Sequence, residues 1–101
     1  MEIYLLEQDL NSGYDTYDSV VVIAENEDEA RKIHPSSFVT HIKNSKWMGT
    51  YSGGLKIGGE YEQLSSDWVK FDQIEQIKVT HIGTATEEQK KGVLLASFNA
   101  G

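Results

Sequence analysis

The chain contains no cysteine, and it has one proline, no repeat and no long apolar run. Without cysteine there is no disulfide framework, no thiolate metal ligand and no cysteine nucleophile. The lack of a repeat excludes solenoid and collagen-like architectures. No window approaches the roughly 18 apolar residues that cross a bilayer. The opening MEIYLLEQDL has Glu2 where a signal peptide would be basic. We therefore expect a cytoplasmic protein that makes no membrane contact.

Basic residues are also scarce. Nine lysines and arginines stand against sixteen aspartates and glutamates, which gives a formal charge of -7. A field of that sign repels phosphate backbones, so direct binding to nucleic acid is disfavoured. It favours a basic partner surface or a cation, although many soluble proteins are acidic only because like charge keeps them apart in solution.

Apolar patterning predicts four strands. Residues 3–8 and 19–25 are two apolar runs whose connection is too short for a helical crossover, which indicates an antiparallel hairpin. Residues 77–85 alternate as a half-buried strand does. The closing run VLLASF, residues 93–98, is so apolar that we place it inside the sheet rather than at its edge. Residues 86–92 are either one helical turn or a polar connection.

One helix has well-specified ends. Asn26 can cap it, and Glu29 three residues later completes the spacing of a capping box. Pro35 ends it, because proline lacks the amide hydrogen and disfavours helix at the residue before it. Ala30 and Ile33 give the helix an apolar stripe that can lie on the sheet.

Residues 36–66 have no clear pattern. Two Gly-Gly pairs bracket LKI, so the segment is either a glycine-flanked hairpin or arm, or an excursion from the domain. The sequence predicts one α+β domain over residues 1–101, with an antiparallel or mixed β-sheet of about four strands. One short helix covers one face, and 36–66 is a peripheral, glycine-rich insertion. The other face needs 36–66 or a second subunit as its cover, so we expect a homo-oligomer.

The stretch NSGYDTYDS, residues 11–19, holds the candidate binding residues Tyr14, Asp15, Tyr17 and Asp18. The aspartates can form Asx turns, so one interpretation is a purely structural loop. The other is a contact surface, because a tyrosine offers a flat apolar face and a hydroxyl and is common where proteins bind partners. Both interpretations stay open at the level of the sequence.

No pattern predicts an enzyme. Asp15 and Asp18 can converge as a carboxylate pair, but neither has a sign of burial. GGLKIGG lacks the Lys-Ser/Thr step of a phosphate loop and the spacing of a dinucleotide fingerprint. The three histidines have no metal-ligand spacing, and we interpret His34 as a cation at the helix end and His81 as a partly buried strand residue. We expect no catalytic residue, no metal and no cofactor.

Two stretches carry a resemblance to a known group of proteins. YLLEQDLNSGYDTYDSVVVIAENEDEARKIHP and IKVTHIGTATEEQKKGVLLASFNAG resemble small proteins of phages and prophages, over roughly residues 3–35 and 68–101. The resemblance implies a small accessory protein in the host cytoplasm. Such a protein binds a host component, for example a nuclease or a defence enzyme, or sequesters a signalling nucleotide.

Four functions remain to be weighed. The first is a noncatalytic anti-defence protein that inhibits a host protein by occupying a basic site through the Tyr-Asp loop. The second is an oligomeric sponge that holds a small nucleotide with Lys56 and the glycine amides. The third is a hydrolase or transferase that uses Asp15 or Asp18. The fourth is a virion or structural protein. The missing catalytic motifs favour binding over catalysis.

Overall fold

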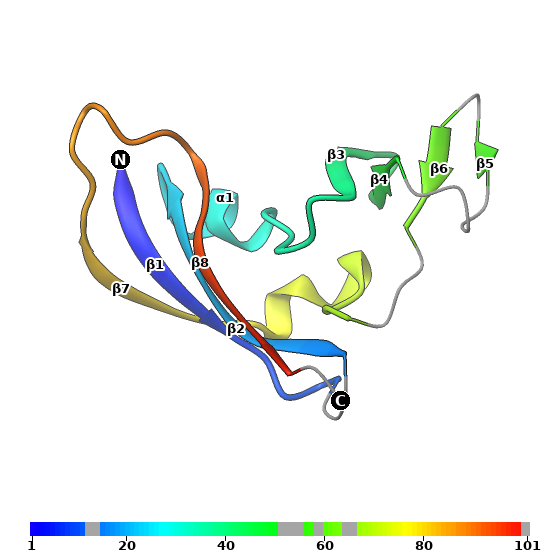
Figure 1. The fold of residues 1–101 in the computed structure, drawn as a ribbon, viewed down its shortest axis with the longest axis horizontal. Helices are drawn as coiled ribbons and strands as arrows, with labels where there is room; N and C mark the ends of the chain where they lie inside the picture. The colour runs from blue at the N-terminus through cyan, green and yellow to red at the C-terminus, as the bar shows by residue number, and fades with distance from the viewer. Residues whose placement is uncertain (12–14, 51–55, 58–59, 64–66, 100–101) are drawn as a thin grey trace.

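The computed structural model describes residues 1–11, 15–50, 56–57, 60–63 and 67–99. Its elements are β1 (Glu2–Glu7), β2 (Thr16–Ala24), α1 (Glu27–Arg31), β3 (Val39–Lys43), β4 (Lys46–Gly49), β5 (Lys56–Ile57), β6 (Glu60–Glu62), the 3-10 helix η1 (Phe71–Gln76), β7 (Lys78–Thr84) and β8 (Gly92–Asn99). The strands form two sheets, ordered β7-β1-β2-β8 and β3-β4-β6-β5 (Figure 1). All described strand pairs are antiparallel. The chain is thus a small, compact, mostly antiparallel β domain with little helix.

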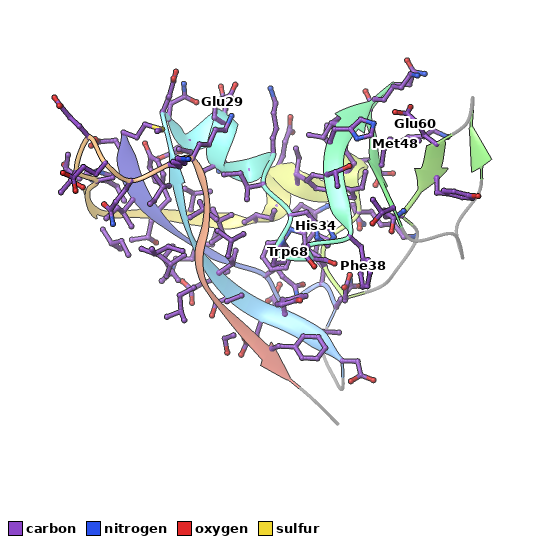
Figure 2. All side chains as sticks on the ribbon, turned by 45° about the horizontal axis from the view of Figure 1, so that its top comes forward. Glu29, His34, Phe38, Met48, Glu60 and Trp68 are labelled. Carbon is purple, nitrogen blue, oxygen red and sulfur yellow. The ribbon has the colours of Figure 1, made fainter. Side chains whose placement is uncertain are left out.

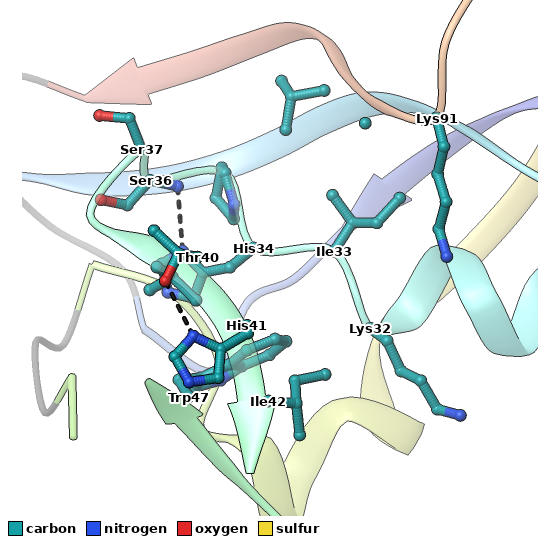
Figure 3. Close-up of a pocket in the computed structure, with 14 residues that line it drawn as sticks. Lys32, Ile33, His34, Ser36, Ser37, Thr40, His41, Ile42, Trp47 and Lys91 are labelled. Atoms are coloured by element: carbon teal, nitrogen blue, oxygen red, sulfur yellow. Dashed lines mark hydrogen bonds between the residues drawn. The ribbon is translucent and has the colours of Figure 1, made fainter. Parts of the chain in front are cut away.

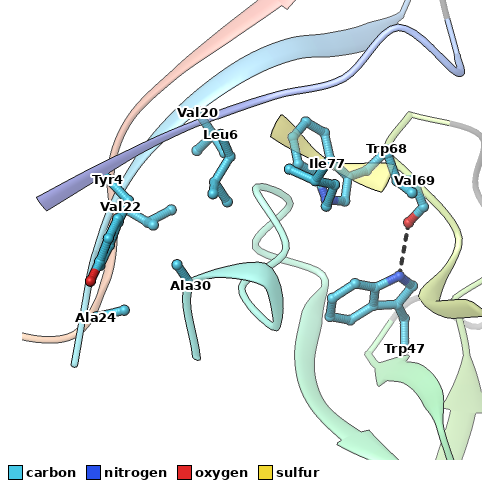
Figure 4. Packing of buried hydrophobic residues seen from close by; sticks show 10 residues of the cluster. All are labelled: Tyr4, Leu6, Val20, Val22, Ala24, Ala30, Trp47, Trp68, Val69 and Ile77. Atoms are coloured by element: carbon cyan, nitrogen blue, oxygen red, sulfur yellow. Dashed lines mark hydrogen bonds between the residues drawn. The ribbon is translucent and has the colours of Figure 1, made fainter. Parts of the chain in front are cut away.

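The first sheet consists of the four strands that the sequence predicts, and one of its faces carries the core. Two rows of side chains cross all four strands on this face: Val79, Leu6, Val20 and Ala96, then His81, Tyr4, Val22 and Val93. Leu6 and Val22 are fully buried, and their cluster continues into Ala30 of α1, Trp47 of β4 and Ile77 (Figure 4). Burial of each large apolar side chain stabilises the fold by about 1.5–3 kcal/mol.

The helix begins as its sequence predicts. The Asn26 side chain accepts a hydrogen bond of 2.9 Å from the backbone N–H of Glu29. Ala30 is buried against the sheet, as predicted, and Ile33 packs on the same core from the connection that follows the helix. The helix ends at Arg31, before the predicted limit at Pro35. Residues 86–91 contain no described helix and form a polar turn.

The second sheet corrects the expectation of a single sheet of about four strands. Two residues with positive φ, Asn44 and Ser45, join β3 to β4, as in a type I′ hairpin turn. Trp47 of β4 reaches the main core, and its indole Nε1 donates a 3.0 Å hydrogen bond to the Val69 carbonyl. The strands of this sheet have two to five residues. Strands that short give little periodicity to read in a sequence.

One glycine permits the close approach of β3 and β4. A Cβ atom at Gly49 would lie 1.7 Å from the carbonyl oxygen of Phe38. The same carbonyl accepts a 3.0 Å hydrogen bond from the backbone N–H of Thr50. Any larger residue at position 49 would push these two backbones apart.

The expectation that the closing strand lies inside the sheet is wrong, because β8 lies at an edge. Its inner neighbour is β2, and no described strand pairs with its other side. A register shift between Val93 and Leu95 places Leu94 at a bulge. The apolar run misled the prediction, because an apolar run of this length usually marks a strand buried on both faces.

The second face of the first sheet carries no described helix or strand. α1, η1 and the second sheet all lie on the core side (Figure 1). Thr80, Leu5, Val21 and Leu95 form a row across the four strands on the uncovered face, which we call the outer face. Among the described helices, none is long and apolar enough to cross a membrane.

Candidate functional site

The turn between β1 and β2 is fastened by two amide side chains. The Gln8 Nε2 donates hydrogen bonds to the carbonyls of Asn11, at 2.8 Å, and of Tyr17, at 2.7 Å. The Gln8 Oε1 accepts a 2.9 Å hydrogen bond from the backbone N–H of Asn11. The side-chain Nδ2 of Asn11 donates a hydrogen bond to the Trp68 carbonyl. These bonds tie the turn to the chain segment that precedes η1. The described part of the turn is therefore held in place by side-chain to backbone hydrogen bonds, as a structural turn is.

Of the predicted binding residues, Tyr17 lies in β2 and not in the turn. Its ring is half-buried, packs on the core, and lies 4.7 Å between centroids from the ring of Phe98 in β8. Its N–H donates a 2.8 Å bond to the Asp67 carbonyl. Burial, and then the charge of Asp67, raise the pKa of the Tyr17 phenol. Tyr17 thus positions the end of β8.

The remaining predicted residues differ in what can be said of them. Asp15 is exposed and has a φ of 60°, and Asp18 is exposed at a bulge of β2. Tyr14 lies outside the described residues, as do the two Gly-Gly pairs. Lys56 belongs to β5, but its side chain is not described. The structure therefore brings Tyr17, Asp15 and Asp18 to one end of the first sheet, beside Phe98.

The β8 strand presents four large exposed apolar side chains, more than any other described strand. They are Val93, Leu94, Leu95 and Phe98, with Leu95 the most exposed at 68%. We call β8 with these four side chains the β8 edge. Its sequence GVLLASFN has no charge. An unpaired, uncharged edge strand is a template for pairing with another strand, which is why most proteins blunt such edges with charge.

The interpretation of His34 as a helix-end cation is wrong. The residue lies past the end of α1, its side chain is 5% exposed, and burial lowers its pKa to about 4. Its Nδ1 accepts a 3.0 Å bond from the Ser36 N–H, and its ring meets the edge of Trp47 at 5.1 Å (Figure 3). His34 is therefore a neutral core residue at neutral pH. It lies among the labelled side chains near the centre of Figure 2.

The other two histidines lie at the surface beside carboxylates. His41 Nε2 lies 2.8 Å from Glu60, and Lys43 donates a 3.1 Å bond to the same carboxylate, which lowers the pKa of Glu60. His81 Nε2 lies 2.8 Å from Glu2, and the His81 side chain is 51% exposed, so its predicted partial burial is wrong. No group of three metal-ligating side chains occurs in the described part of the chain.

A groove of about 500 Å³ lies between β3 and the start of β8. Ile33 lies on its floor, and its inner wall comes from His34 of the α1–β3 connection and from Trp47 (Figure 3). Lys32 and Lys91 lie on one side, and Thr40 and His41 on the other. Nothing in the sequence singled this groove out, because its walls come from segments about fifty residues apart.

No known protein family, curated protein or solved structure matches the chain. The residues themselves must therefore indicate its function. Sequence reasoning missed three residues. Gln8 and Asn11 hold the turn between β1 and β2, and Trp47 joins the second sheet to the core of the first. The only sequence signal for the first two is their spacing of three beside a glycine-containing turn, and such a spacing is common.

Proposed function

We propose that the protein is a noncatalytic binding protein that occupies a basic surface on a partner protein through the β8 edge. One observation carries the proposal: the exposed apolar side chains of β8 lie on a strand that has no charge and no described outer neighbour. Extended segments add to such edges, with main-chain hydrogen bonds for affinity and side-chain pockets for specificity.

Charge supports a basic partner. Asp15 and Asp18 are exposed at the end of the sheet where Tyr17 packs on Phe98. The whole chain carries a formal charge of -7. Such a field speeds association with a positively charged surface and disfavours acidic partners. Apolar contacts along β8 would then hold the complex, while the aspartates select its partner.

The resemblance to small phage and prophage proteins supports a host component as the partner. Inhibition of a host defence protein in the host cytoplasm is the role we propose, with no catalytic step and no cofactor. The domain then acts as one unit over residues 1–101, and the α+β description applies through the single short helix and η1 packed on one face of the first sheet.

Self-association is a second candidate, and the outer face favours it. Leu5, Val21 and Leu95 form an apolar row that no described helix or strand covers. A homo-oligomer, including a virion component, would bury this row. The two candidates respond oppositely to salt, because two copies each carry a formal charge of -7. Salt screens that repulsion and strengthens self-association, whereas it weakens binding to a basic partner.

The test compares capture of host proteins by three immobilised variants. The wild type is compared with Leu95→Lys, and Ile82→Lys is the matched control on the opposite edge, where Ile82 is 52% exposed. We expect wild type and Ile82→Lys to retain one partner that Leu95→Lys loses. The purified partner should bind more weakly as salt rises.

Capture that survives Leu95→Lys would overturn the role of β8, and affinity that rises with salt would overturn the basic partner. A wild-type oligomer in native mass spectrometry that strengthens with salt, with no host protein retained, would establish the second candidate instead.

A further inference from the structure

The groove between β3 and β8 has a charge that contrasts with the rest of the chain. About one residue in six is acidic in the whole sequence. Yet the fourteen residues that line the groove include Lys32 and Lys91 and no carboxylate. A concave surface lined by one sign of charge concentrates ligands of the opposite sign.

The lining also combines apolar and hydroxyl groups. Ile33, Val39 and Ile42 are half-buried along the floor. Hydroxyls come from Ser36 and Thr40, and the latter lies 2.9 Å from the His41 Nδ1. Figure 3 shows Ile33 and Ile42 between the lysines and the hydroxyls. An apolar floor with a few polar groups around it is typical of small-molecule sites.

The inner wall of the groove is rigidly held. His34 accepts from the Ser36 N–H, and its ring meets Trp47 edge-on. Trp47 in turn donates to the Val69 carbonyl and meets Phe71 edge-on at 5.2 Å. A ligand therefore meets a preformed wall, and little ordering entropy is lost when it binds.

Lys32 is the cation best placed to meet a ligand. Lys91 already donates a 2.8 Å bond to Glu29, which lowers the pKa of that carboxyl, and His41 lies 2.8 Å from Glu60. Lys32 is exposed, and its charge also helps to lower the pKa of Glu29, but within the described ranges it forms no direct ion pair with a carboxylate.

We propose that this groove binds a small organic anion, whose anionic group pairs with Lys32 and whose apolar body lies over Ile33 and Ile42. The groove's volume of about 500 Å³ falls within the range of roughly 300–1,000 Å³ that small-molecule sites have. The groove adjoins the β8 edge, because Gly92 and Val93 line it, but binding of the anion does not depend on the proposed partner.

Another groove among the described residues shows what distinguishes the first. It has about 300 Å³ and lies on the other side of Trp47. Its lining includes Lys46 and Glu62, which form an ion pair of 3.4 Å. A groove whose charges already neutralise each other offers an anion little net attraction.

The test follows backbone amide NMR signals during titration with four probes. Two complete probes combine an anionic group with a body: adenosine 5′-monophosphate has a flat body and octanoate an aliphatic one. Two partial probes, the halves, have only one of these features: adenosine has the flat body and inorganic phosphate has the anionic group. We expect one complete probe to shift signals across residues 32–42 and 91–93 at concentrations where the halves do not. Lys32→Glu should weaken that binding about tenfold or more, and the control Lys78→Glu on β7 should not.

Binding of the monophosphate assigns a flat body to the ligand, and binding of octanoate assigns an aliphatic one. The proposal is overturned if neither complete probe shifts the groove signals. It is equally overturned if binding is unchanged in Lys32→Glu or equally weakened in Lys78→Glu, because the anion then has no specific partner in the groove.

Discussion

The two edge strands of the first sheet, β7 and β8, differ in the side chains that they expose to solvent. β7 carries Lys78 and His81 at exposed positions, and its register with β1 shifts beside Ile82. Charge and a bulge are the usual protection of an edge against further pairing. β7 also exposes one large apolar side chain, Ile82. β8 has a bulge at Leu94, but four of its exposed side chains are large and apolar and none is charged. This difference is the reason why the proposal places the partner at β8 and not at β7.

The largest expected effect is on the free energy of unfolding, and it should distinguish a buried leucine from an exposed one. Leu6→Ala removes a fully buried side chain from the core row and should lower the free energy of unfolding by about 2–5 kcal/mol. Leu95→Ala should change it by less than about 0.5 kcal/mol. Chemical denaturation of both variants measures the difference. A large loss in Leu95→Ala would mean that β8 leucines serve the fold and not a partner.

A second comparison concerns two histidines, His34 in the groove beside β8 and His81 on β7. His34 takes up a proton only near pH 4 in the folded chain, but near pH 6.5 when unfolded. Its stabilising contribution is therefore complete above pH 6.5 and decreases as the pH falls. The free energy of unfolding should drop by about 2 kcal/mol between pH 7.5 and 5.

Urea denaturation at several pH values between 7.5 and 5 measures this drop. That range lies above the lowered pKa values of Glu29 and Glu60, so these carboxylates stay ionised. His34→Gln should flatten the pH dependence, and His81→Gln should preserve it. A flat wild-type profile would show that His34 is not buried as described.

The smallest effect should come from Asp15 and Asp18, at the end of the first sheet where Phe98 of β8 lies. Replacing Asp15 and Asp18 together by asparagine removes two exposed charges without touching the apolar contacts. We expect slower association with the basic partner and a shallower salt dependence, with the dissociation rate nearly unchanged. Stopped-flow kinetics at two salt concentrations measures both rates. A faster dissociation in this variant would place the aspartates inside the contact instead of at its rim.

The first sheet could be predicted because its signals are local. Apolar runs and the Asn26 cap specified four strands and one helix without knowledge of their neighbours. The edge position of β8 could not be predicted, because periodicity reports how apolar a strand is and not what lies beside it. The second sheet depends on Trp47 and Gly49, whose roles arise only from contacts with Val69 and Phe38.

The candidate sites were less predictable than the fold. Tyr17 was expected in a turn but packs on Phe98, a residue 81 positions later in the chain. His34 was expected at a helix end, yet the helix ends three residues earlier and leaves the ring to the core. Burial of this kind is a property of the assembled sheets, and a single sequence does not encode it locally.

Hydrogen exchange of the free protein and of its complex tests the role of β8 most directly. If β8 pairs with a partner, backbone amides within Gly92–Asn99 should become strongly protected on binding, while those of Lys78–Thr84 exchange at their free rates. Protection of β7 with β8 unchanged would contradict the assignment of the partner to the uncharged edge.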